Sequence, residues 1–152
     1  MKLVFTKGAG KFDRMEVVRA GQPPELVDCP KQGIIPHDMV HYAVEHTLGA
    51  RGFLTRVKDG EAAAFRMQAE AQSDAVERLV EVFQGDAWSG GQSPAADLIE
   101  MLRVTCHARA CPMLDVDAAA IDDVRAVIAD LTRQWAAVPV GGVLELGFSG
   151  DA

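Results

Sequence analysis

The order in which strand-like and helical segments follow one another constrains this chain more than any single motif. Three short stretches with strand character stand within the first thirty positions: KLVFT, DRMEVVRAG and ELVDCP. Helical patterns separated by glycine and proline follow, and the last apolar run, VLELGF, again has strand character. This order predicts an α+β fold: a small antiparallel sheet of three to four strands, made from an N-terminal hairpin and the C-terminal strand, packed with four to five helices.

The length of the chain suits one hydrophobic core. With 152 residues, of which 49% are apolar, it is long enough for a well-filled core and too short for two comfortable ones. No internal repeat, low-complexity tract or long linker divides the sequence. We therefore expect a single α+β domain over residues 1–152.

Charge and composition exclude several classes of protein. The net charge is -7 and the basic residues are scattered, which is unlike a nucleic-acid binder and disfavours anionic membrane surfaces. No apolar run reaches the ~18 residues of a spanning helix, and the N-terminus lacks the apolar core of a signal peptide. Three cysteines do not make a disulfide framework. We expect a soluble cytoplasmic protein that partners neither nucleic acid nor membrane.

Glycine, proline and capping residues mark where the helices begin and end. Pro36 stands at the first turn of a helix, Asp38 complements its dipole, and Gly49 is a natural C-terminal cap. For residues 53–57 the sequence predicts a strand or an extended connection before an Asp-Gly turn. Further helical patterns cover residues 61–72, 73–85, 93–111 and 117–135.

The helix in PHDMVHYAVEHTLG, residues 36–49, carries three of the four histidines. At about 100° per residue, His37 falls on the core side, His41 at the rim of that side, Glu45 next to it and Asp38 toward the polar side. Histidines four residues apart on a helix can converge on one ion. These four side chains are our candidate metal or ligand site; the cofactor stays open, and zinc and other divalent metals are the candidates.

The spacing HDMVH is close to H-E-x-x-H, in which two histidines hold zinc and the glutamate activates water. Asp38 replaces that glutamate and is one methylene shorter, which weakens the protease interpretation. A third ligand has to come from elsewhere, and the candidates are Cys29, Cys106, His107 or another carboxylate. The interpretation that we favour over a metal site is an ordinary structural role, with His37 bonded across the core and a rim histidine paired with a carboxylate.

The cysteines near the end of the fourth helical pattern lie in CHARAC. Cys106 belongs to the apolar face of that helix, where a small buried hydrophobic side chain is the expected role. Cys111 precedes Pro112 and is a candidate for exposure. Adjacent helical residues point about 100° apart, so Cys106 and His107 are poorly placed for a catalytic dyad.

The histidine helix also resembles a group of bacterial proteins. PHDMVHYAVEHTLG, followed by GF, is similar to uncharacterised bacterial proteins with a P-H-D-[LM]-V-H-[FY]-x-V-E signature, and the VGGVLELGF ending is compatible with them. The matching positions are Pro36, His37, Asp38, His41 and Glu45. The resemblance covers about one tenth of the chain and implies no activity.

Three functional hypotheses follow. The first is a non-enzymatic association or binding domain, a homodimer or other homo-oligomer through an exposed sheet edge, or a binder of another partner. The second is a metal- or small-ligand-binding protein centred on His37 and His41, and its sharpest version is a metal-dependent hydrolase. The third is a metal-free acid–base enzyme that uses His37 with Asp38 or Glu45. The sequence names no substrate or small-molecule ligand.

Overall fold

A four-stranded antiparallel sheet forms one side of the protein. The structure is a computed structural model that describes residues 1–63 and 70–149. The strands stand in the order β3-β2-β1-β4, and β4 pairs with β1 so that Leu144 lies opposite Phe5. The predicted return of the C-terminal strand to the N-terminal sheet is thus confirmed. The bounds are β1 (Lys2–Thr6), β2 (Phe12–Val18), β3 (Glu25–Pro30) and β4 (Val143–Gly147).

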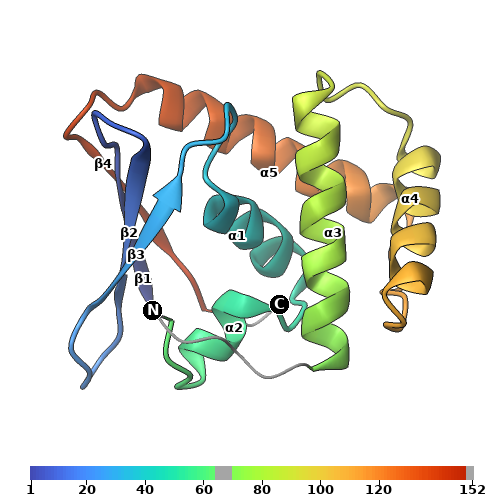
Figure 1. The fold of residues 1–152 in the computed structure, drawn as a ribbon, viewed down its shortest axis with the longest axis horizontal. Helices are drawn as coiled ribbons and strands as arrows, with labels where there is room; N and C mark the ends of the chain where they lie inside the picture. The colour runs from blue at the N-terminus through green and yellow to red at the C-terminus, as the bar shows by residue number, and fades with distance from the viewer. Residues whose placement is uncertain (64–69, 150–152) are drawn as a thin grey trace.

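Five helices complete the described part of the chain, and Figure 1 shows them on one side of the sheet. Next to the sheet lies α1, α3 packs beyond it, α4 is farthest away, and α5 runs across the top. This arrangement confirms the predicted α+β fold. The bounds are α1 (His37–Leu48), α2 (Phe53–Lys58), α3 (Ala71–Trp88), α4 (Ala95–Ala108) and α5 (Ala118–Ala137).

The alternation of side chains along the strands explains why the helices gather on one face. Leu3, Phe5, Met15 and Val17 are fully buried, while their neighbours in the strands are more exposed. Period-2 alternation places such residues together on one face of a sheet. Burial of that face at about 25 cal/mol per Å² of apolar surface is the main force that holds the helices against it.

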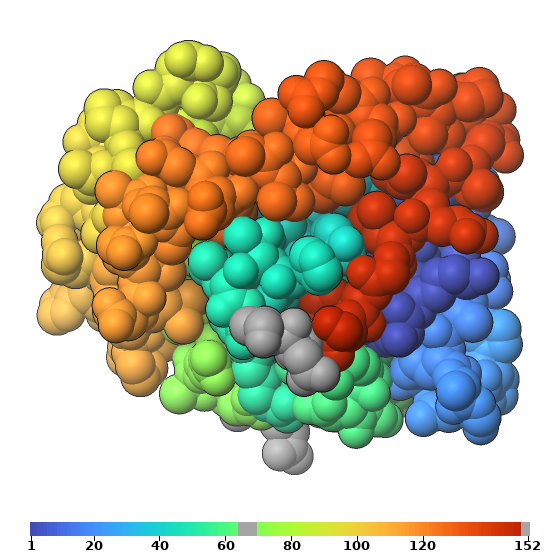
Figure 2. All heavy atoms as spheres, turned by 180° about the vertical axis from the view of Figure 1, so that it is seen from behind, coloured from blue at the N-terminus to red at the C-terminus, as the bar shows by residue number. Residues whose placement is uncertain are grey.

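Helix α1 is the central element because it contacts α2, α3 and α5. It begins after Pro36 and ends at Gly49, whose left-handed φ of 62° allows its N–H to bond to the Glu45 carbonyl, as the sequence predicts. Figure 2, seen from behind, shows α5 in orange arching over the teal end of α1, with the red C-terminal segment beside it. Side chains of α1 are therefore enclosed from several directions.

Two sequence predictions about the middle of the chain are wrong. Residues 53–58 form the helix α2 rather than a strand or an extended connection. Helix α3 begins at Ala71, before the predicted start at residue 73, and continues through Gly85 to Trp88, beyond the predicted end at residue 85, since a glycine inside a helix costs only about 1 kcal/mol. Of the predicted helical stretch 61–72, residues 64–69 lie outside the described residues.

Within residues 1–63 and 70–149, no helix combines the length and the hydropathy needed to cross a bilayer.

Candidate metal centre

Two helices bring the central polar cluster together. His37 and His41 lie one turn apart on α1, and their ring centroids are 4.8 Å apart. Helix α3 supplies Glu77, whose carboxylate oxygens lie 3.0 Å from His37 Nε2 and 2.8 Å from His41 Nε2. Both imidazoles therefore face one carboxylate through the same ring nitrogen. We call His37, His41 and Glu77 the histidine–glutamate cluster.

The other ring nitrogen of each histidine is also held. His37 Nδ1 lies 2.9 Å from Oε1 of Gln84, one helical heptad after Glu77 on α3. His41 Nδ1 lies 2.9 Å from Oε2 of Glu45. Since oxygen atoms accept hydrogen bonds, each Nδ1 carries the proton as donor. The Nε2 atoms of both rings are thereby aimed at Glu77.

Glu45 is fully buried and accepts hydrogen bonds from the start of α2. Its carboxylate accepts hydrogen bonds from the backbone N–H groups of Gly52 at 3.0 Å, Leu54 at 3.1 Å and Thr55 at 2.9 Å. It also accepts one from the Thr55 hydroxyl at 2.9 Å. These N–H groups have no partner inside their own helix, and a negative charge there is favourable. One carboxylate thus caps α2 and orients His41.

Glycine is required where this carboxylate approaches the backbone. A Cβ atom at Gly52 would lie 2.6 Å from Cδ of Glu45 and 2.6 Å from Cγ1 of Val76. Either the Glu45 side chain or α3 would have to shift. The sequence signal is therefore a glutamate at the end of one helix and a glycine seven residues later.

The cluster changes the proton affinities of its members. Burial would lower the pKa of His41, but its hydrogen bonds to Glu45 and Glu77 outweigh burial and raise the pKa to about 10. Burial would also lower the pKa of His37, but the Glu77 and Gln84 hydrogen bonds together with the Glu77 charge raise it. Burial would raise the pKa of Glu77, but the bonds from both histidines hold it well below its usual range. The imidazolium N–H groups therefore donate hydrogen bonds to an ionised Glu77 carboxylate.

The three side chains form a group that could hold a metal ion. One ligand atom from each lies within 4.8 Å of the others, so small movements bring all three to the ~2.0–2.2 Å bond lengths of zinc. Two imidazoles and one carboxylate are a recurrent zinc ligand set. Metal-binding histidines almost always donate their second N–H to a carboxylate or carbonyl oxygen. Gln84 and Glu45 occupy those positions here.

The four site residues predicted from the sequence have different surroundings in the structure. His37 and His41 do converge, but their predicted places are exchanged: the His41 side chain is only 2% exposed and that of His37 is 39% exposed. Glu45 supports His41 instead of facing Glu77. Asp38, predicted on the polar side, is buried, and it accepts a hydrogen bond from the Cys29 thiol at 3.7 Å. Asp38 is buried because the first turn of α1 contacts Cys29 at the end of β3.

The third candidate ligand, Glu77, lies on a helix that sequence analysis did not connect with the site. Of the proposed donors, Cys29 bonds to Asp38, while Cys106 and His107 lie on α4. Glu77 and Gln84 are three before and four after Val80 on α3, so they share a face with it. Polar residues inside the apolar stripe of α3 were the signal that could have identified them.

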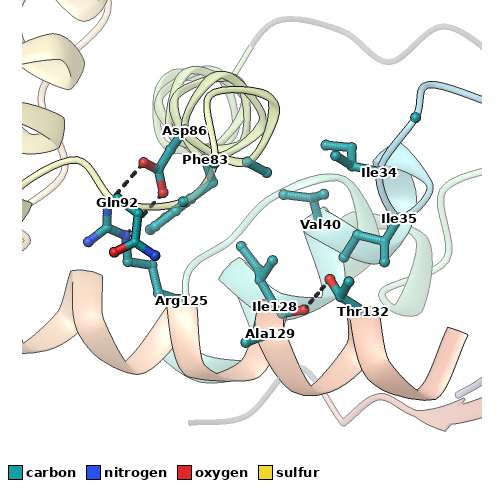
Figure 3. Close-up of a pocket in the computed structure, with 14 residues that line it drawn as sticks. Ile34, Ile35, Val40, Phe83, Asp86, Gln92, Arg125, Ile128, Ala129 and Thr132 are labelled. Atoms are coloured by element: carbon teal, nitrogen blue, oxygen red, sulfur yellow. Dashed lines mark hydrogen bonds and ion pairs between the residues drawn. The ribbon is translucent and has the colours of Figure 1, made fainter. Parts of the chain in front are cut away.

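A cavity in the described residues lies elsewhere, between α1, α3 and α5, as Figure 3 shows. It measures about 410 Å³, and its walls include Ile35, Val40, Phe83 and Ile128. The ion pair between Asp86 and Arg125 closes one end, with the Asp86 carboxylate 3.0 Å from Nη2. None of the three cluster side chains lines it. We place the chemistry at the cluster, because the ionisable groups there converge and those of the cavity are paired.

The chain matches no protein-family model, no curated protein and no solved structure in our comparisons.

Proposed function

We propose that this protein binds a divalent metal ion, in the first place zinc, through Nε2 of His37, Nε2 of His41 and the carboxylate of Glu77. The observation that carries the proposal is the orientation of the two rings. Gln84 and Glu45 fix the Nδ1 atoms, so the Nε2 atoms of both histidines face one carboxylate. An isolated ion pair needs only one such contact, whereas a metal site needs all of them.

Metal binding would exchange protons for the ion. In the metal-free protein, the histidines hold their Nε2 protons toward Glu77, because their pKa values are raised. Zinc requires neutral imidazoles, so binding releases protons and becomes tighter as the pH rises. The Glu77 carboxylate needs no deprotonation near neutral pH, because its pKa is lowered.

The exposed side of the cluster determines what else a bound ion would contact. The side chains of Glu77 and His37 are 34% and 39% exposed, and that of His41 is 2% exposed. With three protein ligands, the remaining coordination position would open on the His37–Glu77 side. Zinc sites with three protein ligands keep that position for water or a substrate.

Two functions predicted from the sequence have less support. A metal-dependent hydrolase needs a base beside the bound water, but Asp38 is bonded to Cys29 and Glu45 is engaged by α2. The hydrolase therefore stays a prediction. Association with a second copy or another partner also stays a prediction.

The first experiment measures metal content by mass spectrometry on untagged protein that has been purified without chelator. It is followed by calorimetric titration of zinc into chelator-treated protein. We expect one zinc per chain and release of protons to the buffer. His41→Ala and Glu77→Gln should abolish tight binding, and Gln84→Ala should weaken it about tenfold or more, because it removes only the support of His37.

Matched controls separate loss of a ligand from loss of charge or of fold. Glu81→Gln removes a carboxylate one turn further along α3 that pairs with Arg78, and His46→Ala removes an exposed histidine of α1. Both should bind zinc like the wild type, and circular dichroism should show unchanged helicity in every variant used. Equal zinc binding by wild type and Glu77→Gln would contradict the proposal.

A further inference from the structure

The C-terminal end of α4 joins two cysteines through a specific helix-ending motif. The N–H of Cys111 bonds to the carbonyl of Cys106 at 3.0 Å, and the N–H of Ala110 bonds to the carbonyl of His107 at 3.2 Å. This pair of bonds, six-to-one and five-to-two, defines a Schellman motif. Ala110 holds its left-handed position, with a φ of 53°.

The motif brings the two thiols together. In a Schellman motif, the side chains of the two residues joined by the outer bond frequently touch, and here both are cysteines. Burial and the contact with the Cys111 thiol raise the pKa of Cys106 to about 11, consistent with adjacent sulfur atoms. Neither cysteine is in a disulfide. Pro112 follows immediately and prevents the helix from continuing.

The two thiols differ in access to solvent. Cys106 is 2% exposed, while Cys111 is partly exposed. A small oxidant in solution therefore reaches Cys111 first. The third cysteine, Cys29, is buried beside Asp38 on the sheet, so it serves as an internal reference.

We propose that Cys106 and Cys111 form a reversible disulfide at the end of α4, with a peroxide as the oxidant. The Cys111 sulfur attacks one peroxide oxygen, the O–O bond breaks, and with hydrogen peroxide the products are a sulfenic acid and water. The Cys106 sulfur then attacks the sulfenic sulfur. The S–O bond breaks, and the hydroxide leaves as water with the Cys106 proton. Overall, two thiols are oxidised and one peroxide is reduced to two waters.

A nearby cation assists the second step. Arg78 on α3 lies close enough to Cys106 for its charge to favour the thiolate, although burial and Cys111 outweigh it. Its Nε is buried and makes no hydrogen bond within the described part of the chain. The guanidinium thus stabilises the negative charge that develops on Cys106 as it attacks.

The test uses the reduced full-length protein treated with hydrogen peroxide, then with iodoacetamide in guanidinium chloride so that buried thiols react, and then with trypsin. Cleavage after Arg103, Arg109 and Arg125 separates the two cysteines into peptides 104–109 and 110–125. We expect these peptides to appear joined as the main oxidised product, and dithiothreitol to separate them again. Intact-mass spectrometry before the digest should show the loss of two hydrogens.

Variants complete the test. Cys29→Ser should form the same linked peptides as the wild type, while Cys111→Ser should leave Cys106 fully alkylated by iodoacetamide. Ala110→Gly should retain the link, because glycine adopts the same backbone conformation without strain. The proposal is overturned if wild-type Cys111 accumulates as sulfinic acid while Cys106 stays alkylatable, or if the linked peptide contains Cys29. Both readouts are independent of metal binding at the histidines.

Discussion

Helix α1 buries one carboxyl group near each of its ends, and the two have very different surroundings. Glu45 in the last turn accepts five hydrogen bonds, from His41, from three N–H groups of α2 and its cap, and from the Thr55 hydroxyl. Asp38 in the first turn accepts one side-chain hydrogen bond within the described residues, from the weak thiol donor Cys29. Burial is the largest cause that raises the pKa of Asp38.

The difference shows how the same helix tolerates two buried acids. A buried carboxylate is favourable only where donors replace the water that it has lost. The start of α2 provides such donors for Glu45, and this fixed carboxylate in turn holds His41. The thiol beside Asp38 provides little, so its burial favours the protonated form. The C-terminal end of α1 therefore positions a network of charged groups, whereas its N-terminal end mainly contributes packing contacts.

The largest effect should follow from removing Glu45. Glu45→Ala leaves the N–H groups of Gly52, Leu54 and Thr55 without their acceptor and releases His41. We expect the free energy of unfolding to fall by about 3–5 kcal/mol, because buried donors are left unpaired. Urea denaturation followed by circular dichroism measures this.

Glu45→Gln tests the reason for that loss, since the amide keeps the shape and one acceptor oxygen but removes the charge. A loss smaller than that of Glu45→Ala is expected. If His46→Ala, the exposed control on the same helix, destabilised as much as Glu45→Ala, the special role of Glu45 would be refuted.

A change of pH should have an effect of intermediate size on the free energy of unfolding. In the metal-free protein the pKa of His41 is raised from 6.5 to about 10, so the stability it contributes is fully present below pH 6.5 and is lost as the pH rises toward 10. The slope reaches at most about 1.4 kcal/mol per pH unit for one proton. Glu45→Gln, which removes one cause of the shift, should flatten this alkaline decline in urea denaturation from pH 6 to 10. An identical decline in that variant would contradict our assignment.

The smallest effect should come from the other end of the helix. Asp38→Asn should change the free energy of unfolding by less than about 1 kcal/mol at pH 7, since it removes one weak bond and a poorly solvated charge. Because the pKa of Asp38 is raised, the wild type loses stability relative to Asp38→Asn as the pH rises above 3.8. Thermal melting of both proteins at pH 4 and pH 7 tests the sign. A growing advantage of the wild type would be the opposite result.

Local signals were sufficient for the fold but only partly for the site. Strand alternation, Pro36, Gly49 and the cap Asp117 act within a few residues, so the sheet, α1 and the start of α5 followed from the sequence. Helix α2 was missed because its capping carboxylate belongs to another helix.

The histidine–glutamate cluster was predicted only in part, because local signals do not report contacts between helices. The spacing of His37 and His41 predicted that they converge, since both lie on one helix. Glu77 lies on α3, and its contact with them depends on how α3 packs against α1. Which histidine is enclosed was also decided by that packing and by Phe53, whose ring centroid lies 5.8 Å from that of His41.

The carboxylate of Glu45 couples two equilibria that would otherwise be independent. When the first turn of α2 opens, the Leu54 and Thr55 amides become exchangeable with solvent deuterium, and the same event frees the acceptor that orients His41. A ligand that needs the ordered imidazole therefore binds only while that turn is closed, and its binding shifts the equilibrium toward the closed turn. By thermodynamic reciprocity, the exchange rates of these two amides report the occupancy of a site on the neighbouring helix.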